Sequence, residues 1–220
     1  METIKTNLAQ LATEHPGASR VLHARGLDYC CGGQRSLEDA CQERGLDPDE
    51  ILQEIAAQSR SPLKEHSCAE LPLRDLTRFI VERYHASLRR ELPELVALAE
   101  KVEAKHAAKA SCPTGLAAHL RECHAAMLDH MEKEEQILFP LISSGMGSQT
   151  AGPVQVMEDE HREHALNLQR TRELTDDFSP PAEACTSWRA LYLRLHELEA
   201  ELMEHIHLEN NVLFPRALCE

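Results

Sequence analysis

Residues 130–140 read HMEKEEQILFP, and residues 205–215 read HIHLENNVLFP. In each stretch a histidine precedes a glutamate by four residues, and Leu-Phe-Pro begins four residues after the glutamate. Side chains four residues apart lie on the same face of an α-helix, so each stretch places an imidazole beside a carboxylate. The two pairs are His130 with Glu134 and His205 with Glu209.

Apolar side chains flank both pairs at the spacing of packed helices. Steps of three and four residues reach Met127 and Ile137 on either side of the first pair, and Leu202 and Val212 on either side of the second. This spacing predicts that both pairs lie in buried seams between helices. Because a buried carboxylate is costly unless it is paired or bound to a metal, each glutamate is expected to have such a partner.

The repeat extends upstream of both pairs. One histidine lies 45 residues before His130, and another lies 44 residues before His205. The pattern of one histidine followed by His-x3-Glu therefore occurs twice, and four helices that turn such ligands inward form a bundle with a pseudo-two-fold axis. The combined set is His85, His130, Glu134, His161, His205 and Glu209.

Four histidines and two glutamates predict a site for two metal ions. Two carboxylates can bridge two ions that lie roughly 3.5–4 Å apart, and each ion then binds two imidazole nitrogens and two carboxylate oxygens. An oxo or hydroxo bridge would be a fifth ligand and would leave one position open for a small molecule. Nitrogen and oxygen ligands suit iron, manganese or zinc, and the histidine-rich four-helix arrangement favours iron. We therefore expect two iron ions in a non-haem di-iron centre.

An isolated histidine on an apolar face is more often a hydrogen-bonded core residue than a metal ligand. The matched repeat favours the metal interpretation for the six residues of the set. His164, three residues after His161, is open to two interpretations. It is either a substitute ligand or a residue outside the ligand set, and we favour the second.

The composition excludes several classes of function. A net charge of −14 over 220 residues argues against nucleic acid and anionic membranes as partners. The sequence has no long apolar segment, so neither a signal peptide nor a membrane span is expected. Eight cysteines without a secretory signal indicate a reducing, cytoplasmic location. Few aromatic residues and no strand-like alternation predict an all-α protein.

Proline and glycine residues divide the chain into three parts. Residues 1–58 contain four short helical segments and are expected to form a small helical domain. Residues 59–71 contain one proline among polar residues, a second proline follows at residue 72, and the segment is predicted to be a linker. Residues 72–220 are predicted to form the four-helix bundle, in which Pro93 is expected to kink or split the first helix.

The small domain contains an unusual Cys30-Cys31-Gly32-Gly33 sequence. Adjacent cysteines form a disulfide only with strain, and the two glycines allow another group to approach closely. Arg35 would favour the thiolate form of a nearby cysteine. Two interpretations remain open: a loop with two incidental thiols, or a reactive or metal-contacting thiol pair formed by Cys30 and Cys31.

These motifs resemble a known family over essentially the whole chain. The paired His…His-x3-Glu halves resemble the hemerythrin-like HHE cation-binding domain, and the strings MEKEEQILFP and LENNVLFPRAL are similar to those of the repair-of-iron-centres family. The DYCCGG segment resembles the ScdA-type amino-terminal domain. Together they resemble the repair-of-iron-centres family. The resemblance implies a hemerythrin-like four-helix bundle preceded by a small helical domain.

The resemblance also implies a function. It implies a non-haem di-iron centre on the six residues of the set, and cytoplasmic repair of iron–sulfur clusters damaged by nitric oxide or peroxide, by supplying iron. Damaged iron–sulfur proteins would then be the partners, and nitric oxide or dioxygen the small ligands. Oxygen-carrying hemerythrins have one more histidine ligand, and the lack of a matched fifth histidine argues against stable dioxygen transport.

Two other functions need the same six ligands. One is an enzyme, either a di-iron nitric oxide reductase or a peroxidase. The other is a sensor of dioxygen or nitric oxide. We favour an iron donor over a turnover enzyme, and the sequence leaves the oligomeric state, including a homodimer, open.

Overall fold

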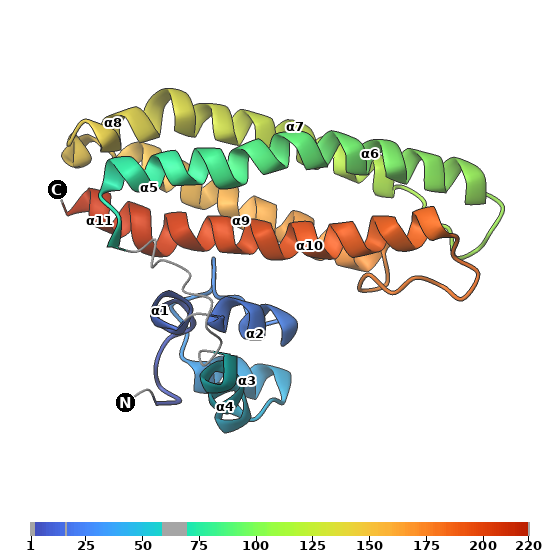
Figure 1. Cartoon of the computed structure of the whole chain (residues 1–220), viewed down its shortest axis with the longest axis horizontal. Helices are drawn as coiled ribbons and strands as arrows, with labels where there is room; N and C mark the ends of the chain where they lie inside the picture. Colours follow the sequence, from blue (N-terminus) through green and yellow to red (C-terminus); the bar gives the residue numbers. More distant parts are fainter. Residues whose placement is uncertain (1–2, 16, 59–69, 220) are drawn as a thin grey trace.

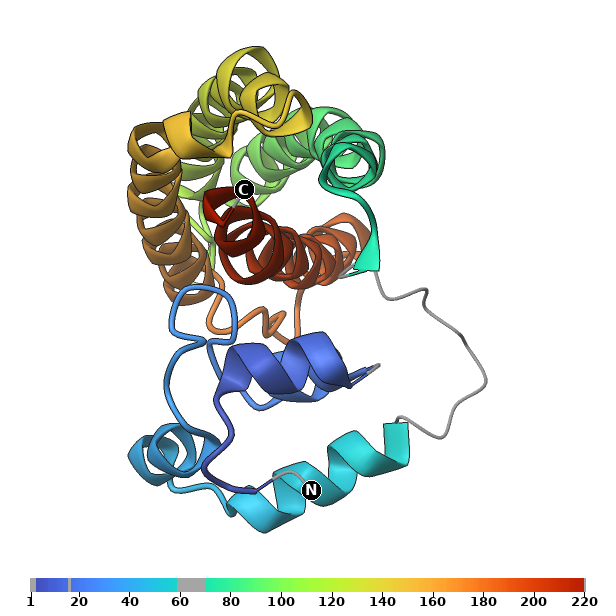
Figure 2. The same ribbon diagram turned by 90° about the vertical axis from the view of Figure 1, so that its left-hand side faces the viewer.

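The computed structural model describes residues 3–15, 17–58 and 70–219. Within these ranges the regular structure is helical, which confirms the predicted all-α fold. Four long helical rods run along one another, and four short helices pack beside them (Figures 1 and 2). Of the predicted linker, only residues 70 and 71 lie in the described part. The proposed domain boundaries at residues 58 and 72 stay a prediction.

Each rod of the bundle contains one long α-helix, and three of the rods are interrupted by a five-residue π-helical turn. After the second rod comes a 3₁₀ turn, η4 (Gly147–Gln149). The rods are, in order, α5 (Leu73–Ile80), η2 (Val81–His85) and α6 (Ala86–His106); α7 (Leu116–Lys133), η3 (Glu134–Leu138) and α8 (Phe139–Ser143); α9 (Ala151–Leu174); and α10 (Thr186–Leu208), η5 (Glu209–Leu213) and α11 (Phe214–Leu218).

Two of the four short helices begin at residues whose side chains cap the helix N-terminus. Asn7 accepts a hydrogen bond from the backbone N–H of Gln10, and Ser36 accepts one from the N–H of Asp39, as N-capping residues do. The buried apolar residues of the four short helices form a core separate from the clusters of the bundle. The helices are α1 (Leu8–Glu14), α2 (Ala18–Ala24), α3 (Leu37–Arg44) and α4 (Pro48–Gln58).

Two details of the bundle differ from the sequence prediction. Helix α6 continues through Pro93, so of the two outcomes expected there the split is wrong, and the kink stays a prediction. Pro93 is exposed, and the carbonyl group that it leaves without an N–H partner can be solvated. Ile137 is 55% exposed rather than buried. The wider π turn after Glu134 moves the buried face by one residue, to Leu138.

Two apolar clusters fill the bundle on either side of the candidate ligands. One cluster is formed mainly by α6, α7 and α10, with Leu88 and Met131 among its members. The other is formed mainly by α5, α8, α9 and the last rod, with Ile80 and Leu138 among its members. His85 lies between Ile80 and Leu88 in the chain, so the polar site is enclosed by two water-excluding layers.

No helix in the described ranges combines the length and apolar character needed to span a membrane.

A buried charged group joins the short helices to the bundle. Glu199 of α10 lies 3.0 Å from Nε2 of His23 on α2 and accepts a 2.7 Å hydrogen bond from Nε of Arg172 on α9. Burial alone would raise the pKa of Glu199, but the hydrogen bonds from His23 and Arg172 reverse this effect and lower the pKa. The carboxylate is therefore held in its charged form.

This contact predicts a pH-dependent stability. A carboxylate whose pKa is lower in the folded state stabilises the fold above its unfolded pKa, and the contribution is lost as the pH falls through the folded pKa. In the metal-free protein, Glu199→Gln should lower the free energy of unfolding at neutral pH by about 1–3 kcal/mol and flatten its decline below about pH 4.5. Urea unfolding at several pH values measures both effects. Glu197→Gln, at an exposed position on the same helix, is the control and should change neither.

Candidate metal centre

The π-helical turns position the predicted ligands. His85 ends η2, whereas Glu134 and Glu209 begin η3 and η5. Short π turns inside α-helices are rare overall, and those that occur often lie at functional sites. The N–H of Phe139 bonds to the carbonyl of Glu134 across five residues. The proline that follows in each copy has no N–H and cannot resume the regular hydrogen-bond ladder at once.

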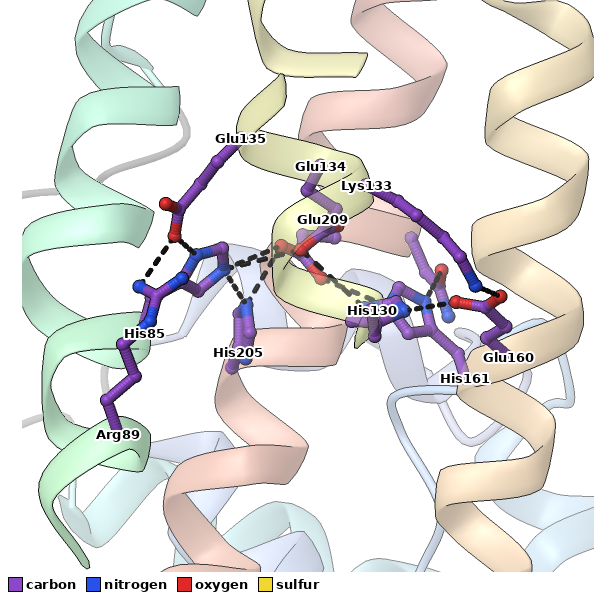
Figure 3. Close-up of polar contacts among 11 residues, drawn as sticks. His85, Arg89, His130, Lys133, Glu134, Glu135, Glu160, His161, His205 and Glu209 are labelled. Atoms are coloured by element: carbon purple, nitrogen blue, oxygen red, sulfur yellow. Dashed lines mark hydrogen bonds and ion pairs between the residues drawn. The ribbon is translucent and has the colours of Figure 1, made fainter. Parts of the chain in front are cut away.

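The first group of candidate ligands is formed by His85, His205 and both glutamates. The Nε2 atoms of His85 and His205 lie 3.2 Å apart. Nε2 of His85 lies 3.3 Å from Oε2 of Glu134, and Nε2 of His205 lies 2.9 Å from Oε1 of Glu209. The four ligand atoms lie within 4.8 Å of one another and point toward a common centre (Figure 3).

The second group repeats this arrangement with His130 and His161. Their Nε2 atoms lie 3.1 Å apart, and Nε2 of His161 lies 3.1 Å from Oε2 of Glu209. Nε2 of His130 lies 3.6 Å from Oε2 of Glu134. The structure thus brings all six predicted residues together, and Glu134 and Glu209 belong to both groups.

The six residues are at most 1% exposed. Among the described residues, neither oxygen of Glu134 has a hydrogen-bond donor, and the same holds for Oε2 of Glu209. Burial raises the pKa of Glu134, and the nearby charge of Glu209 raises it further. Buried carboxylate oxygens without donors are costly unless a cation binds them.

Outer partners fix the orientation of two histidines. Nδ1 of His85 lies 2.7 Å from Oε1 of Glu135, which also pairs with Arg89. Nδ1 of His130 lies 2.9 Å from Oε2 of Glu160. Because a carboxylate accepts hydrogen bonds, each Nδ1 must carry the proton. When such a ring is neutral, its Nε2 atom directs a lone pair to the centre, as in histidines that bind metals.

The other two histidines have different surroundings. Nδ1 of His161 donates a 2.7 Å hydrogen bond to Oδ1 of Asn210. Nδ1 of His205 has no hydrogen-bond partner in the described part of the chain, and the ring of Tyr84 stacks on His205 at 5.2 Å. The Nε2 atoms of each histidine pair lie 3.1–3.2 Å apart, close enough for both to bind the same cation. The donor set therefore fits a metal ion in each group.

Sequence reasoning missed the three outer partners. Each stands next to a predicted ligand: Glu135 follows Glu134, Asn210 follows Glu209, and Glu160 precedes His161. Adjacent residues on a helix point about 100° apart. The position of an outer partner next to one ligand in the chain therefore does not reveal which histidine the outer partner contacts. The matched positions of Glu135 and Asn210 in the two copies were the available signal.

His164 lies outside both groups. It is buried, and its ring meets the edge of the His130 ring with a centroid distance of 5.0 Å. Burial lowers the pKa of His164 to about 3, so the ring is neutral. This position agrees with the favoured interpretation of His164 as a residue outside the ligand set.

Cys30 and Cys31 are in neither group, but they lie against the bundle. Cys30 is buried, and Sγ of Cys31 lies 3.6 Å from the carbonyl oxygen of His161. Both cysteines are free, with their sulfur atoms 3.8 Å apart. The contact with Cys31 and burial raise the pKa of Cys30, whereas the hydrogen bond from Cys30 lowers the pKa of Cys31. Cys31 is therefore the more readily ionised thiol of the pair.

The predicted role of Arg35 is wrong. Its guanidinium pairs with Glu43 at 2.6 Å instead of a thiol. The loop is held instead by Asp28, whose carboxylate accepts hydrogen bonds from the backbone N–H groups of Cys30, Cys31 and Gly32.

Comparisons with known proteins identify the family. The hemerythrin HHE cation binding domain matches residues 77–217, and the ScdA N-terminal domain, described as a domain of unknown function (DUF542), matches residues 4–59. A protein from Musicola paradisiaca named iron-sulfur cluster repair protein YtfE is 46% identical over 212 residues, which cover 96% of both chains. Proteins of the same name from Yersinia pseudotuberculosis and Yersinia pestis are 45% identical over 218 residues, which cover 99% of each chain. With its hemerythrin-type domain and buried histidine–glutamate cluster, the chain belongs to the repair-of-iron-centres family.

Proposed function

We propose that the six buried histidine and glutamate side chains hold two iron ions, with Glu134 and Glu209 as bridging ligands. The observation that carries this proposal is that both glutamates belong to both ligand groups. Four neutral imidazoles carry no charge, and the two carboxylates offset only part of the charge of two iron ions, so the loaded centre has a net positive charge. Such a charge is tolerable in an apolar interior only with outer carboxylates nearby, and Glu135 and Glu160 supply them.

We further propose that the protein repairs iron–sulfur clusters damaged by nitrosative or oxidative stress, by supplying iron to damaged iron–sulfur proteins in the cytoplasm. The names of the relatives support this function, because the relatives match the chain over nearly its whole length. Iron bound at the centre would supply a redox-active cation that other ligands can capture. The chain's own contribution is to hold neutral imidazoles in place and to exclude water until the iron is delivered.

A second candidate function has one observation in its favour. An apolar cavity of about 40 Å³ lies within the bundle, and Leu88, Leu120, Met127 and His164 are among its lining residues. Since His164 contacts the His130 ring, this cavity could lead a small apolar molecule such as nitric oxide or dioxygen toward the centre. A di-iron nitric oxide reductase or peroxidase, or a sensor, would use such a cavity.

One experiment separates these functions. Iron-loaded protein is added in stoichiometric amounts to an iron–sulfur enzyme whose cluster has been damaged by nitric oxide, with sulfide and a reductant present. We expect activity of the damaged enzyme to return in proportion to the iron supplied, and metal-free protein to give no recovery. Sustained conversion of nitric oxide to nitrous oxide, without recovery of the damaged enzyme, would contradict the donor function and favour the enzyme.

A further inference from the structure

The two copies of the ligand motif differ on the face that points away from the centre. In the first copy this face carries Glu132, Glu135 and Gln136, of which Glu132 and Gln136 are exposed. Their counterparts in the second copy are His207, Asn210 and Asn211. These three contact the loop that contains the two cysteines. Within residues 3–15, 17–58 and 70–219, the short helices and their connections therefore cover the second copy and leave Glu132 and Gln136 of the first copy exposed.

Asn210 forms one hydrogen bond to each side of this contact. Its Oδ1 atom accepts from Nδ1 of the candidate ligand His161 at 2.7 Å. Its Nδ2 atom donates to the carbonyl oxygen of Cys30 at 3.3 Å. Nδ2 of Asn211 donates to the same carbonyl at 3.1 Å. A single amide group therefore connects a candidate metal ligand with the cysteine loop.

The cysteine loop is packed tightly on its other side. A Cβ atom at Gly33 would lie 2.5 Å from the carbonyl oxygen of Tyr29 and 2.7 Å from Cβ of Ala9. The backbone N–H of Ala9 also donates to the carbonyl oxygen of Gly33 at 2.9 Å. Because these neighbours are backbone and helix atoms, a side chain at Gly33 would displace the loop.

The matched histidine, His85, has no such connection. Its outer partner, Glu135, bonds to Arg89 of the same bundle, and no contact of Glu135 with the short helices is present in the described part of the chain. The outer support of His85 is thus internal to the bundle. The outer support of His161 depends on a residue that also contacts the cysteine loop.

We propose that Asn210 is a positioning residue that transmits the packing of the Cys30–Cys31 loop to the His161 ring, so that this loop controls how firmly one of the two metal positions retains iron. The controlled position is the group that contains His130 and His161. The group that contains His85 and His205 lacks this control. The proposal deepens the proposed function and rests on it for the identity of the metal.

The physical basis is the orientation of the amide. While the Cys30 carbonyl accepts from Nδ2, Oδ1 is held toward the His161 ring. When the loop moves away, the amide is free to rotate and can turn its NH₂ group toward Nδ1–H, which cannot accept a hydrogen bond. His161 then loses its outer partner, and the loss of such a partner typically weakens metal binding by about 10–100-fold.

Iron release from the full chain tests this coupling. Iron-loaded protein is mixed with a ferrous chelator, and the release of each iron is followed by absorbance. Gly33→Ala should displace the loop and speed the release of one of the two irons by about tenfold or more. Asn210→Asp keeps an acceptor for His161 but has no donor for the Cys30 carbonyl. In the Asn210→Asp background, Gly33→Ala should therefore cause no acceleration.

Glu135→Gln is the matched control, because it alters the outer partner of His85 instead. In this background, Gly33→Ala should still accelerate the release of one iron. A second perturbation avoids any folding defect of Gly33→Ala: iodoacetamide is used to alkylate Cys31 in the folded protein, and Cys31→Ser controls for the other cysteines. Alkylation of the wild type should give the same single acceleration, and Asn210→Asp should abolish it.

Three results would overturn the proposal: equal acceleration of both irons, an undiminished response in Asn210→Asp, or no response to either perturbation of the loop. The release measurement needs bound metal but no damaged enzyme. If the protein fails to reactivate damaged clusters, the proposed function fails, and the release rates still decide whether Asn210 couples the loop to the centre.

Discussion

Replacing either bridging glutamate, by Glu134→Ala or Glu209→Ala, is expected to reduce the iron content from about two atoms per chain to well below one. Each glutamate is a member of both ligand groups, so one substitution removes a ligand from both metal positions. A single histidine substitution removes a ligand from one group only and should have the smaller effect. Elemental analysis of protein purified under identical conditions measures the iron content.

Glu132→Ala is the matched control, because Glu132 lies two residues before Glu134 and its side chain is exposed. This variant should retain the iron content of the wild type. Full iron content in both Glu134→Ala and Glu209→Ala would show that neither glutamate bridges two ions.

The second large effect concerns stability in the absence of iron. Glu134→Gln should raise the free energy of unfolding of the metal-free protein by about 1–3 kcal/mol. The substitution removes a buried carboxyl group whose pKa is raised by burial and by the nearby charge of Glu209, and the new NH₂ group can donate to the Glu209 carboxylate. Excess iron should stabilise the wild type by several kcal/mol, about 4 kcal/mol at a thousandfold excess over Kd. This gain should be largely lost in the variant.

Urea unfolding of metal-free and iron-loaded samples gives all four values. The order of stability of wild type and variant should reverse between the two conditions. A metal-free variant that is less stable than the metal-free wild type would show that Glu134 stabilises the fold without metal.

The repeated His-x3-Glu motif was sufficient to predict the bundle and to select the six residues that converge in the structure. The reason is that a helix has a fixed period: a histidine and a glutamate four residues apart in an apolar seam must face the same neighbours. Matched histidines 44 and 45 residues upstream then identified the facing helices. Long-range geometry followed from local periodicity because the fold is a simple antiparallel bundle.

The sequence failed where this period changes or where contacts lie outside the repeat. The π turns add a residue to one turn, so Ile137 was placed on the wrong face. The predicted effect of Arg35 on the cysteines was wrong because its guanidinium pairs with Glu43. Asn210 was missed because its partners, His161 and the Cys30 carbonyl, come from distant parts of the chain and obey no sequence period.

The most direct test of the account is a crystal structure of the iron-loaded protein with anomalous diffraction data collected at the iron edge. We expect two anomalous peaks, one within the group that contains His85 and His205 and one within the group that contains His130 and His161, with Glu134 and Glu209 in contact with both. A single peak, or peaks at the cysteine loop instead of between the two glutamates, would contradict it.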